Sequence, residues 1–189
     1  MTGRISCGAV QLRAVGEADH ERILAWQNQP DVFDAMDYDM PFAAQDIVDA
    51  ETRAREEGHP FIIEVGGTPI GKIGLNQVSV RDHRAALYVY IGDPAEWGKG
   101  YGTDAIVALL RYAFDRIDLH LVELWGIDGN ERAFACYAHC GFVRDATLRD
   151  RTFRDGAHRA RVVMSVTREE FASASQAWIE RRERELAQT

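Results

Sequence analysis

The stretch that decides the fold of this 189-residue chain is an apolar run followed by a glycine-rich loop. It reads Tyr88-Val89-Tyr90-Ile91-Gly92-Asp93-Pro94-Ala95-Glu96-Trp97-Gly98-Lys99-Gly100-Tyr101-Gly102-Thr103-Asp104-Ala105. Residues 85–91 are almost continuously apolar, which is typical of a central strand, and the Gly92-Asp93-Pro94 turn ends it. After the glycines, apolar residues recur at three- and four-residue steps as far as Ile117, which indicates an amphipathic helix. The segment therefore predicts a strand, a loop and a helix in direct succession.

The glycine loop predicts an anion-binding site. The first turn of a helix leaves backbone N–H groups without partners, the peptide dipoles make that end positive, and glycines let a phosphate approach the backbone. A purely structural tight turn is the alternative interpretation. The loop reads Gly-x-Gly-x-Gly, which differs from both the P-loop pattern and the Gly-x-Gly-x-x-Gly dinucleotide fingerprint. A diphosphate held by a third kind of loop fits the residues best.

The residues before this stretch predict helices and one hairpin. Helices are expected over 17–28, where Pro30 prevents continuation, and over 45–57, where Gly58 is expected to take the left-handed conformation after the last turn. Strands are expected over 11–15, 61–65 and 69–78. The glycine pair Gly66-Gly67 between the last two predicts a tight hairpin turn.

The residues after the loop predict a second hairpin and a helical tail. A buried strand is expected over 119–127, a short helix over 131–140, and a hairpin formed by 142–153 and 157–167 around Asp155-Gly156. Residues 168–189 form a charged helix carrying Phe171, Trp178 and Ile179. This tail could cap the domain, meet a second subunit, or fray.

The composition indicates one packed domain. Hydrophobic residues make up 46% and charged residues 28%, and a chain of this length buries roughly 70% of its unfolded surface without needing disulfides or a metal. No repeat or flexible linker divides it, so residues 1–167 are expected to form a single domain with 168–189 as its tail. The net charge of −8 argues against nucleic acid. No segment approaches the roughly 20 apolar residues of a membrane span, and three cysteines favour a reducing compartment, so a cytoplasmic location is expected.

Two motifs together resemble the acetyl-CoA motifs of the GNAT superfamily of N-acetyltransferases. They are Trp97-Gly98-Lys99-Gly100-Tyr101-Gly102-Thr103-Asp104-Ala105 and Asn130-x-x-Ala133-x-x-x-Tyr137-x-x-x-Gly141-Phe142. Over residues 12–167 the chain looks most like the branch of ribosomal-protein alanine and spermidine acetyltransferases. The resemblance implies an α/β (α+β) fold with a mixed, mostly antiparallel sheet of about seven strands flanked by helices.

The activity implied by this resemblance is direct transfer of an acetyl group from acetyl-CoA to a primary amine. The acceptor would be a polyamine-like or aminoglycoside-like amine, or a protein N-terminus. A homodimer is also suggested, weakly supported by the apparently exposed stripe of Phe171 and Trp178. Two other classes stay open: a catalytically silent acyl-CoA-binding module and a nicotinamide-dependent oxidoreductase.

The resemblance assigns the cofactor contacts residue by residue. Backbone N–H groups of the loop would hold the pyrophosphate, from Gly98, Lys99, Gly100, Tyr101, Gly102 and Thr103. The pantetheine arm would lie along Tyr90, Ile91 and Gly92, and Asn130 and Ala133 would flank it. One position departs from the family pattern: Trp97 replaces the usual Arg or Gln, and Lys99 is a candidate to supply the missing charge.

Tyr137 is the expected catalytic residue. A phenol with an ordinary pKa of about 10 stays protonated at neutral pH and can give its proton to the departing thiolate, whose pKa is about 8.5. The alternative is a half-buried tyrosine that packs beside Phe134 and Gly141. No carboxylate lies in the strand stretch where relatives carry a base. The remaining candidates are Glu64, Asp82, His83 and Asp128, each also readable as a solvated or structural group, or a water chain.

Two further clusters of polar side chains stand out in the sequence. Cys136, His139 and Cys140 could suggest a metal site or a nucleophile, but no second Cys/His cluster completes a zinc site, so no metal is predicted and helix packing is the preferred interpretation. Residues 31–49 carry six aspartates interleaved with aromatic residues. The resemblance places this segment at the acceptor pocket, where an acidic rim would attract a cationic amine, although a solvated surface explains the pattern as well. The aspartates are Asp31, Asp34, Asp37, Asp39, Asp46 and Asp49.

Overall fold

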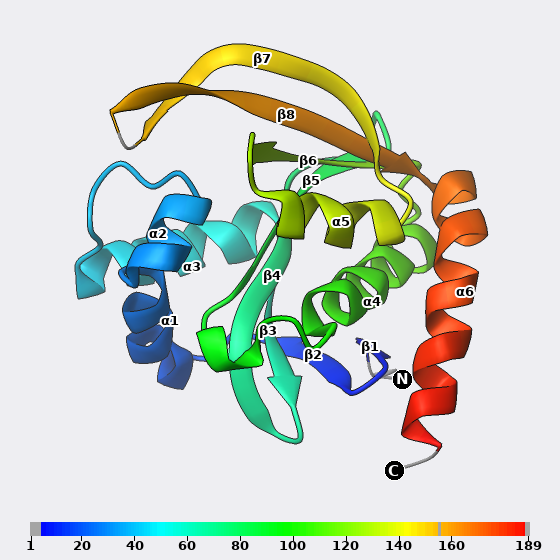
Figure 1. Cartoon of the computed structure of the whole chain (residues 1–189). Coiled ribbons are helices and arrows are strands. Elements are labelled where there is room, and N and C mark those ends of the chain that lie inside the picture. The colour runs from blue at the N-terminus through cyan, green and yellow to red at the C-terminus, as the bar shows by residue number, and fades with distance from the viewer. Residues whose placement is uncertain (1–4, 155, 188–189) are drawn as a thin grey trace.

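Among the described residues, the β5–β6 pair is the one parallel pair in an otherwise antiparallel sheet of eight strands, ordered β1-β2-β3-β4-β5-β6-β8-β7. The computed structural model describes residues 5–154 and 156–187 (Figure 1). The strands are β1 Ile5–Cys7, β2 Val10–Ala14, β3 His59–Val65, β4 Thr68–Ser79, β5 Arg84–Ile91, β6 Leu121–Ile127, β7 Val143–Arg154 and β8 Ala157–Thr167. The expected mixed, mostly antiparallel α/β fold is confirmed, with β1 as an added edge strand too short to show a sequence pattern.

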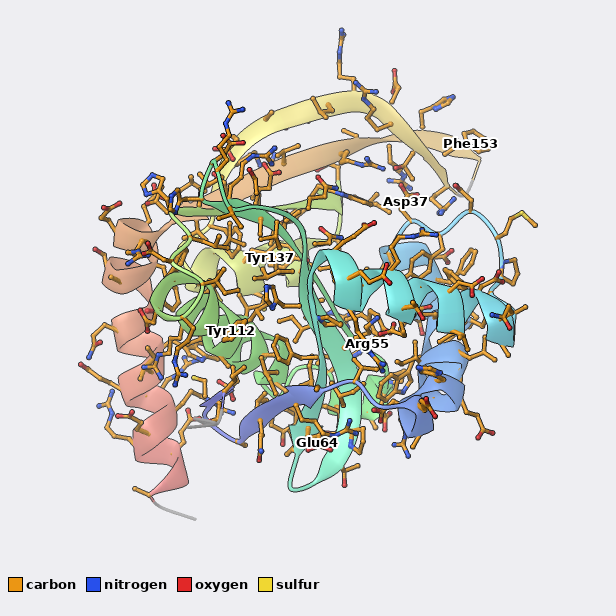
Figure 2. The ribbon with its side chains drawn as sticks, turned by 180° about the vertical axis from the view of Figure 1, so that it is seen from behind. Asp37, Arg55, Glu64, Tyr112, Tyr137 and Phe153 are labelled. Carbon is orange, nitrogen blue, oxygen red and sulfur yellow. The ribbon has the colours of Figure 1, made fainter. Side chains whose placement is uncertain are left out.

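Six α-helices flank this sheet (Figure 1). They are α1 His20–Gln27, α2 Pro30–Ala35, α3 Ala44–Glu57, α4 Tyr101–Asp115, α5 Glu131–His139 and α6 Arg168–Leu186, with 3-10 turns at Glu17–Asp19 and Pro94–Glu96. One cluster of buried residues packs α4 against the sheet, and a second joins α1, α2 and α3 to it. Figure 2 shows α3 lying across the opposite side of the molecule from the view in Figure 1.

Alternation along β5 divides its side chains between these two clusters. Ala85 and Leu87 belong to the cluster that includes α4, whereas Tyr90 belongs to the cluster of α1, α2 and α3. Successive side chains of a strand point to opposite faces, so the sequence of β5 supplies both cores at once. The predicted central position of this strand is therefore confirmed.

Several local predictions were wrong or incomplete. Pro30 does not simply end the first helix; it occupies the first turn of α2, where its missing N–H costs no hydrogen bond. Gly58 is extended rather than left-handed, with φ −162° and ψ −157°. A Cβ there would collide with the carbonyl oxygen of Leu75, so close backbone approach explains the glycine. By contrast, Gly66 and Gly67 have φ of 57° and 81°, as the predicted hairpin requires.

The C-terminal tail caps the domain. Thr167 accepts a hydrogen bond from the Glu170 backbone N–H and begins α6. Phe171 and Ile179 are buried in the main core, and Trp178 packs against it. The stripe read as exposed is thus an intramolecular contact, and the dimer argument drawn from it was wrong. Asp155 of the second predicted hairpin turn lies outside the described residues, while Gly156 has φ 74°.

In the described part of the chain, no helix combines the length and the hydropathy that crossing a bilayer requires.

Candidate active site

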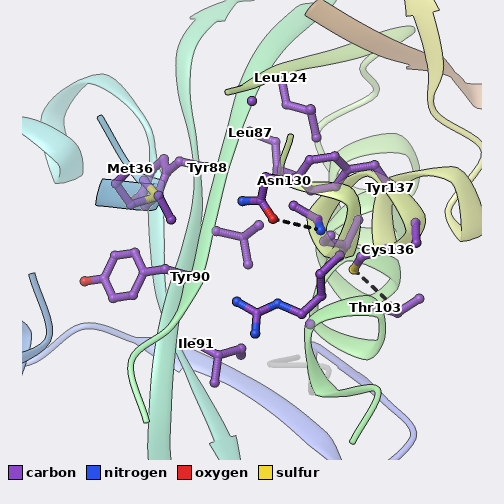
Figure 3. A pocket seen from close by; sticks show the side chains of 18 of the residues that line it. Met36, Leu87, Tyr88, Tyr90, Ile91, Thr103, Leu124, Asn130, Cys136 and Tyr137 are labelled. Atoms are coloured by element: carbon purple, nitrogen blue, oxygen red, sulfur yellow. Dashed lines mark hydrogen bonds between the residues drawn. The ribbon is translucent and has the colours of Figure 1, made fainter. Parts of the chain in front are cut away.

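A cleft opens where β5 and β6 separate. The two strands pair only from Arg84 to Ala86 and from Leu121 to Glu123, after which each continues without the other. Their facing backbone groups beyond this point do not pair across the gap. A cavity of ≈730 Å³ occupies this place and is lined by α2, β5, β6, α5 and the start of α4. Figure 3 shows Met36, Tyr88 and Tyr90 on one side of β5 and Thr103, Cys136 and Tyr137 on the other.

The glycine loop delivers the N-terminus of α4 to this cavity. Gly98 and Gly100 have φ of 77° and 84°, a conformation that favours glycine because a Cβ would be strained. Gly100 is the residue before the first helical turn. Gly98, Gly100, Tyr101, Gly102 and Thr103 all line the cavity. The unpaired N–H groups of the first turn therefore lie at its wall, as an anion site requires.

Trp97 is part of the wall and supports a cation. Its indole Nε1 donates to the carbonyl of Ile91 at 2.9 Å, which ties the loop back to the end of β5. The guanidinium carbon of Arg132 lies 3.9 Å from the centre of its ring. Arg132 lines the cavity, and no described carboxylate forms an ion pair with it. The sequence reasoning missed this residue, although its place two residues after Asn130 was a usable signal.

Lys99 and Gly92 differ from their expected placement. The Lys99 Nζ lies 2.9 Å from Glu96 Oε2, and Lys99 is not among the described residues that line the cavity. Gly92 also lies off the lining. A Cβ on it would overlap the ring of Trp26, which accounts for the glycine by packing. Tyr90 and Ile91 do line the cavity.

The second motif meets the first across the cleft. Asn130 Oδ1 accepts a hydrogen bond from the Ala133 N–H at 3.2 Å and so caps α5 (Figure 3). Asn130, Ala133 and Tyr137 all line the cavity. Burial raises the pKa of the Tyr137 phenol, because the charged phenolate is poorly solvated there. The phenol is therefore protonated at neutral pH.

None of the four candidate bases reaches the cavity. Glu64 lies 2.6 Å from the Arg13 guanidinium, and Asp82 accepts from the Ser79 hydroxyl at 2.8 Å. The His83 ring bonds the Asp118 carbonyl at 2.9 Å. Asp128 is exposed at the surface. These four groups are solvated or have structural partners, so the structure does not place any of them as a base at the cavity.

The cysteines pack against the first turns of α4. Cys136 Sγ lies 3.1 Å from the Thr103 hydroxyl (Figure 3), and Cys140 is fully buried beside it. Burial raises the pKa of the Cys136 thiol to about 11. A neutral thiol is a poor nucleophile, so this cluster has the properties of a packing contact.

The acidic segment contributes one carboxylate to the cavity, because only Asp31 of its six aspartates lines it. Asp46 accepts from the Ala43 N–H at 2.7 Å and caps α3. Asp37 is engaged by three side chains of the β7–β8 hairpin, from Thr152, Arg154 and Arg161. The predicted acidic rim is therefore largely absent from the cavity wall.

The splayed strands, the glycine loop and the second motif together define an acyltransferase-like cleft, and sequence comparison assigns the family. A family model described as the acetyltransferase (GNAT) domain matches residues 10–143, and the chain belongs to this family. The predicted membership is confirmed.

Two curated relatives share part of the chain. A putative ribosomal N-acetyltransferase of Bacillus subtilis is 30% identical over 105 residues, 56% of this chain and 57% of that protein. Spermidine N(1)-acetyltransferase of Vibrio cholerae is 29% identical over 107 residues, 57% of this chain and 61% of that protein. The chain thus matches less than two thirds of the length of each.

Solved structures share the whole fold. Spermidine N-acetyltransferase from Vibrio cholerae, in complex with CoA and spermine, has a TM-score of 0.80 at 21% identity, covering 87% of this chain and 98% of that one. RimJ of Mycobacterium smegmatis, in complex with CoA-disulfide, has a TM-score of 0.79 at 22% identity, and the match covers 92% of this chain and 90% of that one. At these identities the likeness establishes the fold.

Proposed function

We propose that this protein is an acetyl-CoA-dependent N-acetyltransferase that moves an acetyl group directly onto a primary amine. The observation that carries the proposal is the cleft between β5 and β6. It brings unpaired strand backbone, the N-terminus of α4 and the Tyr137 phenol around one cavity. Bound acetyl-CoA supplies an activated acetyl carbonyl and a thiol leaving group.

The residues present suit the phosphate end of that molecule. The N–H groups at Gly100, Tyr101 and Gly102 provide donors at a positive helix terminus. The exposed guanidinium of Arg132, whose central carbon lies 3.9 Å from the centre of the Trp97 ring, provides a full positive charge at the same wall. We propose that Arg132 takes the part that the family pattern gives to the residue at position 97.

The reacting centre lies where β5 loses its parallel neighbour. Backbone N–H groups of β5 that face the gap donate to the oxygen on which negative charge develops as the amine attacks. Asn130 and Ala133 flank the same part of the cleft. Tyr137 gives its proton to the departing sulfur, and its raised pKa keeps that proton available.

Solvent is the proposed recipient of the amine's proton. Three carboxylates line the cavity, Asp31, Glu96 and Glu123. Glu96 is paired with Lys99 and Glu123 with Arg84, and Asp31 is exposed. The two paired carboxylates already face a cation, so we propose that water at the open side of the cleft accepts the proton.

The direct test measures thiol release from acetyl-CoA with a panel of primary amines, together with calorimetric binding of CoA. We expect CoA binding and amine-dependent thiol release, with an acetylated product identified by mass. Binding without transfer to any amine would support a silent acyl-CoA module instead. Absence of CoA binding would overturn both readings.

The remaining sequence predictions are kept as proposals. We propose that residues 1–167 and the tail 168–189 form one unit, which the packing of α6 against α4 supports. A homodimer is proposed from the family resemblance, and a cytoplasmic location from the three cysteines. Light scattering of the purified chain measures the first, and fractionation of cells the second.

A further inference from the structure

The acceptor end of the cavity has an apolar wall. On the side of β5 that faces α2, the lining includes Val32, Met36 and the aromatic rings of Tyr38 and Tyr88. Figure 3 shows Met36 beside Tyr88 and away from the Tyr137 side. Trp125 of β6 and Val163 of β8 extend the same wall. Such a surface gains free energy by covering an apolar body rather than a charged one.

Most carboxylates near this wall already have a cationic partner. Glu51, which is 1% exposed, forms a buried ion pair with Lys72, which is 4% exposed. This pair lies behind Tyr88, whose ring centre is 5.4 Å from the Lys72 Nζ. Of the three lining carboxylates, Glu96 and Glu123 have cationic partners. Asp31 is therefore the one lining carboxylate without an ion pair among the described residues.

Asp37 shows the same neutralisation at the edge of the cavity. Its Oδ1 lies 3.0 Å from Arg154 and its Oδ2 lies 3.0 Å from Arg161, while the Thr152 hydroxyl donates to Oδ2 at 2.8 Å. The Arg161 guanidinium also lies 3.7 Å from the centre of the Trp125 ring. Two cations thus accompany one anion at this edge.

The same contacts link two segments that are distant along the chain. They join the segment after α2 to the β7–β8 hairpin, and Figure 2 shows Asp37 near Phe153 at this edge of the molecule. Arg154 also donates to the Tyr38 carbonyl at 2.8 Å.

A polyamine would fit this wall poorly. Each additional ammonium group must lose water, and among the described residues Asp31 is the one lining carboxylate without an ion pair that could compensate this loss, so a second additional ammonium stays uncompensated. The relatives named for spermidine therefore do not define the acceptor of this chain.

We infer that the acceptor is a small primary monoamine carried on an apolar or aromatic body. This inference rests on the proposed acetyltransferase function. The single amine reaches the thioester, while the apolar body lies against Met36, Tyr88 and Trp125. During transfer the C–N bond forms as the C–S bond breaks, the sulfur takes its proton from Tyr137, and the proton of the attacking amine goes to water, which later returns one to the phenolate.

The first test compares kcat/KM for tyramine, phenethylamine and tryptamine with that for spermidine, spermine and an alanine-initiated peptide. We expect the arylalkylamines to exceed the polyamines and the peptide by about tenfold or more, the size of effect that a matched apolar pocket provides. A polyamine or the peptide as the best acceptor would overturn the inference and leave the proposed function standing. No transfer to any amine would overturn both.

The second test adds a carboxylate to the wall. Met36→Glu should raise kcat/KM for spermidine relative to tyramine by about tenfold, because a new anion compensates the second ammonium. Met40→Glu is the matched control, since Met40 lies in the same segment but is 74% exposed and outside the cavity lining. If the ratio of kcat/KM for spermidine to that for tyramine is equal in the two variants, the apolar wall does not determine acceptor selectivity. Circular dichroism spectra would verify that both variants are folded.

Discussion

Arg182 of α6 binds Asp104 in the first turn of α4, with its Nη2 2.6 Å from an Oδ2 whose residue is 0% exposed. The Trp178 indole also donates to Asp104 Oδ1, at 2.9 Å. A carboxylate in the first turn stabilises a helix, but this one lies at the end where phosphates are proposed to bind. Arg182 cancels its charge and so keeps that terminus attractive to an anion.

Removal of Arg182 should therefore destabilise the fold and weaken cofactor binding together. Arg182→Ala leaves the buried Asp104 carboxylate without its ion pair, a change that typically costs about 3–5 kcal/mol. The uncompensated negative charge of Asp104 should also raise the Kd for acetyl-CoA. Urea denaturation and calorimetry measure the two effects. The exposed Arg184, whose Nε bonds only its own helix at Glu180, supplies the control Arg184→Ala. Similar stability of the two variants would show that the Asp104 contact contributes little.

Arg132, rather than Lys99, should supply the positive charge at the phosphate wall. Arg132→Ala should weaken acetyl-CoA binding about ten- to hundredfold, the usual loss for one charge-assisted hydrogen bond. Lys99→Ala should change the Kd little, because the Lys99 ammonium already faces Glu96. Calorimetric titrations at two salt concentrations distinguish the variants, since the Arg132 contribution should shrink as ionic strength rises. A larger loss for Lys99→Ala would reverse the assignment.

Tyr137→Phe should lower kcat by about 10²–10⁴, the range for loss of a general acid, with an unchanged Kd for acetyl-CoA. The control is Tyr112→Phe, because the Tyr112 hydroxyl bonds His59 at 3.1 Å and lies outside the cavity lining.

The pH profile gives an independent check on Tyr137. The active form is the protonated phenol, and burial raises its pKa above the ordinary value of about 10. The loss of kcat caused by its ionisation should therefore begin only above pH 10. An alkaline limb that is identical in wild type and Tyr137→Phe would assign that ionisation to another group.

Cys136 should make the folded state sensitive to alkali. Burial raises its pKa from about 9 to about 11, so the folded state holds this proton more tightly than the unfolded chain does. The resulting stabilisation is fully present below pH 9 and is lost as pH rises from 9 to 11. Urea midpoints across this interval should fall less steeply in Cys136→Ala than in wild type. Parallel curves would show that this thiol does not contribute.

The family, the central strand and the glycine loop were determined by the sequence alone. These features depend on contiguous residues: an apolar run, glycines at Gly98 and Gly100 that tolerate positive φ, and the apolar stripe of α4. The conformational preferences of neighbouring residues determine each of these features, so predicting them required no knowledge of distant contacts. The meeting of Tyr137 with that loop followed from the resemblance, and the structure places both at one cavity.

Only the tertiary structure decided which charges are free to act. Asp37 loses its predicted role to Arg161, 124 residues away, and Asp104 is neutralised by Arg182, 78 residues away. The stripe of Phe171 and Trp178 becomes core for the same reason. The net charge and the exposure of a site depend on all the residues that folding brings close to it. A sequence motif shows only the residues that are adjacent along the chain. The sequence therefore specified the cofactor end of the cleft, and the packing of distant segments specified the acceptor end.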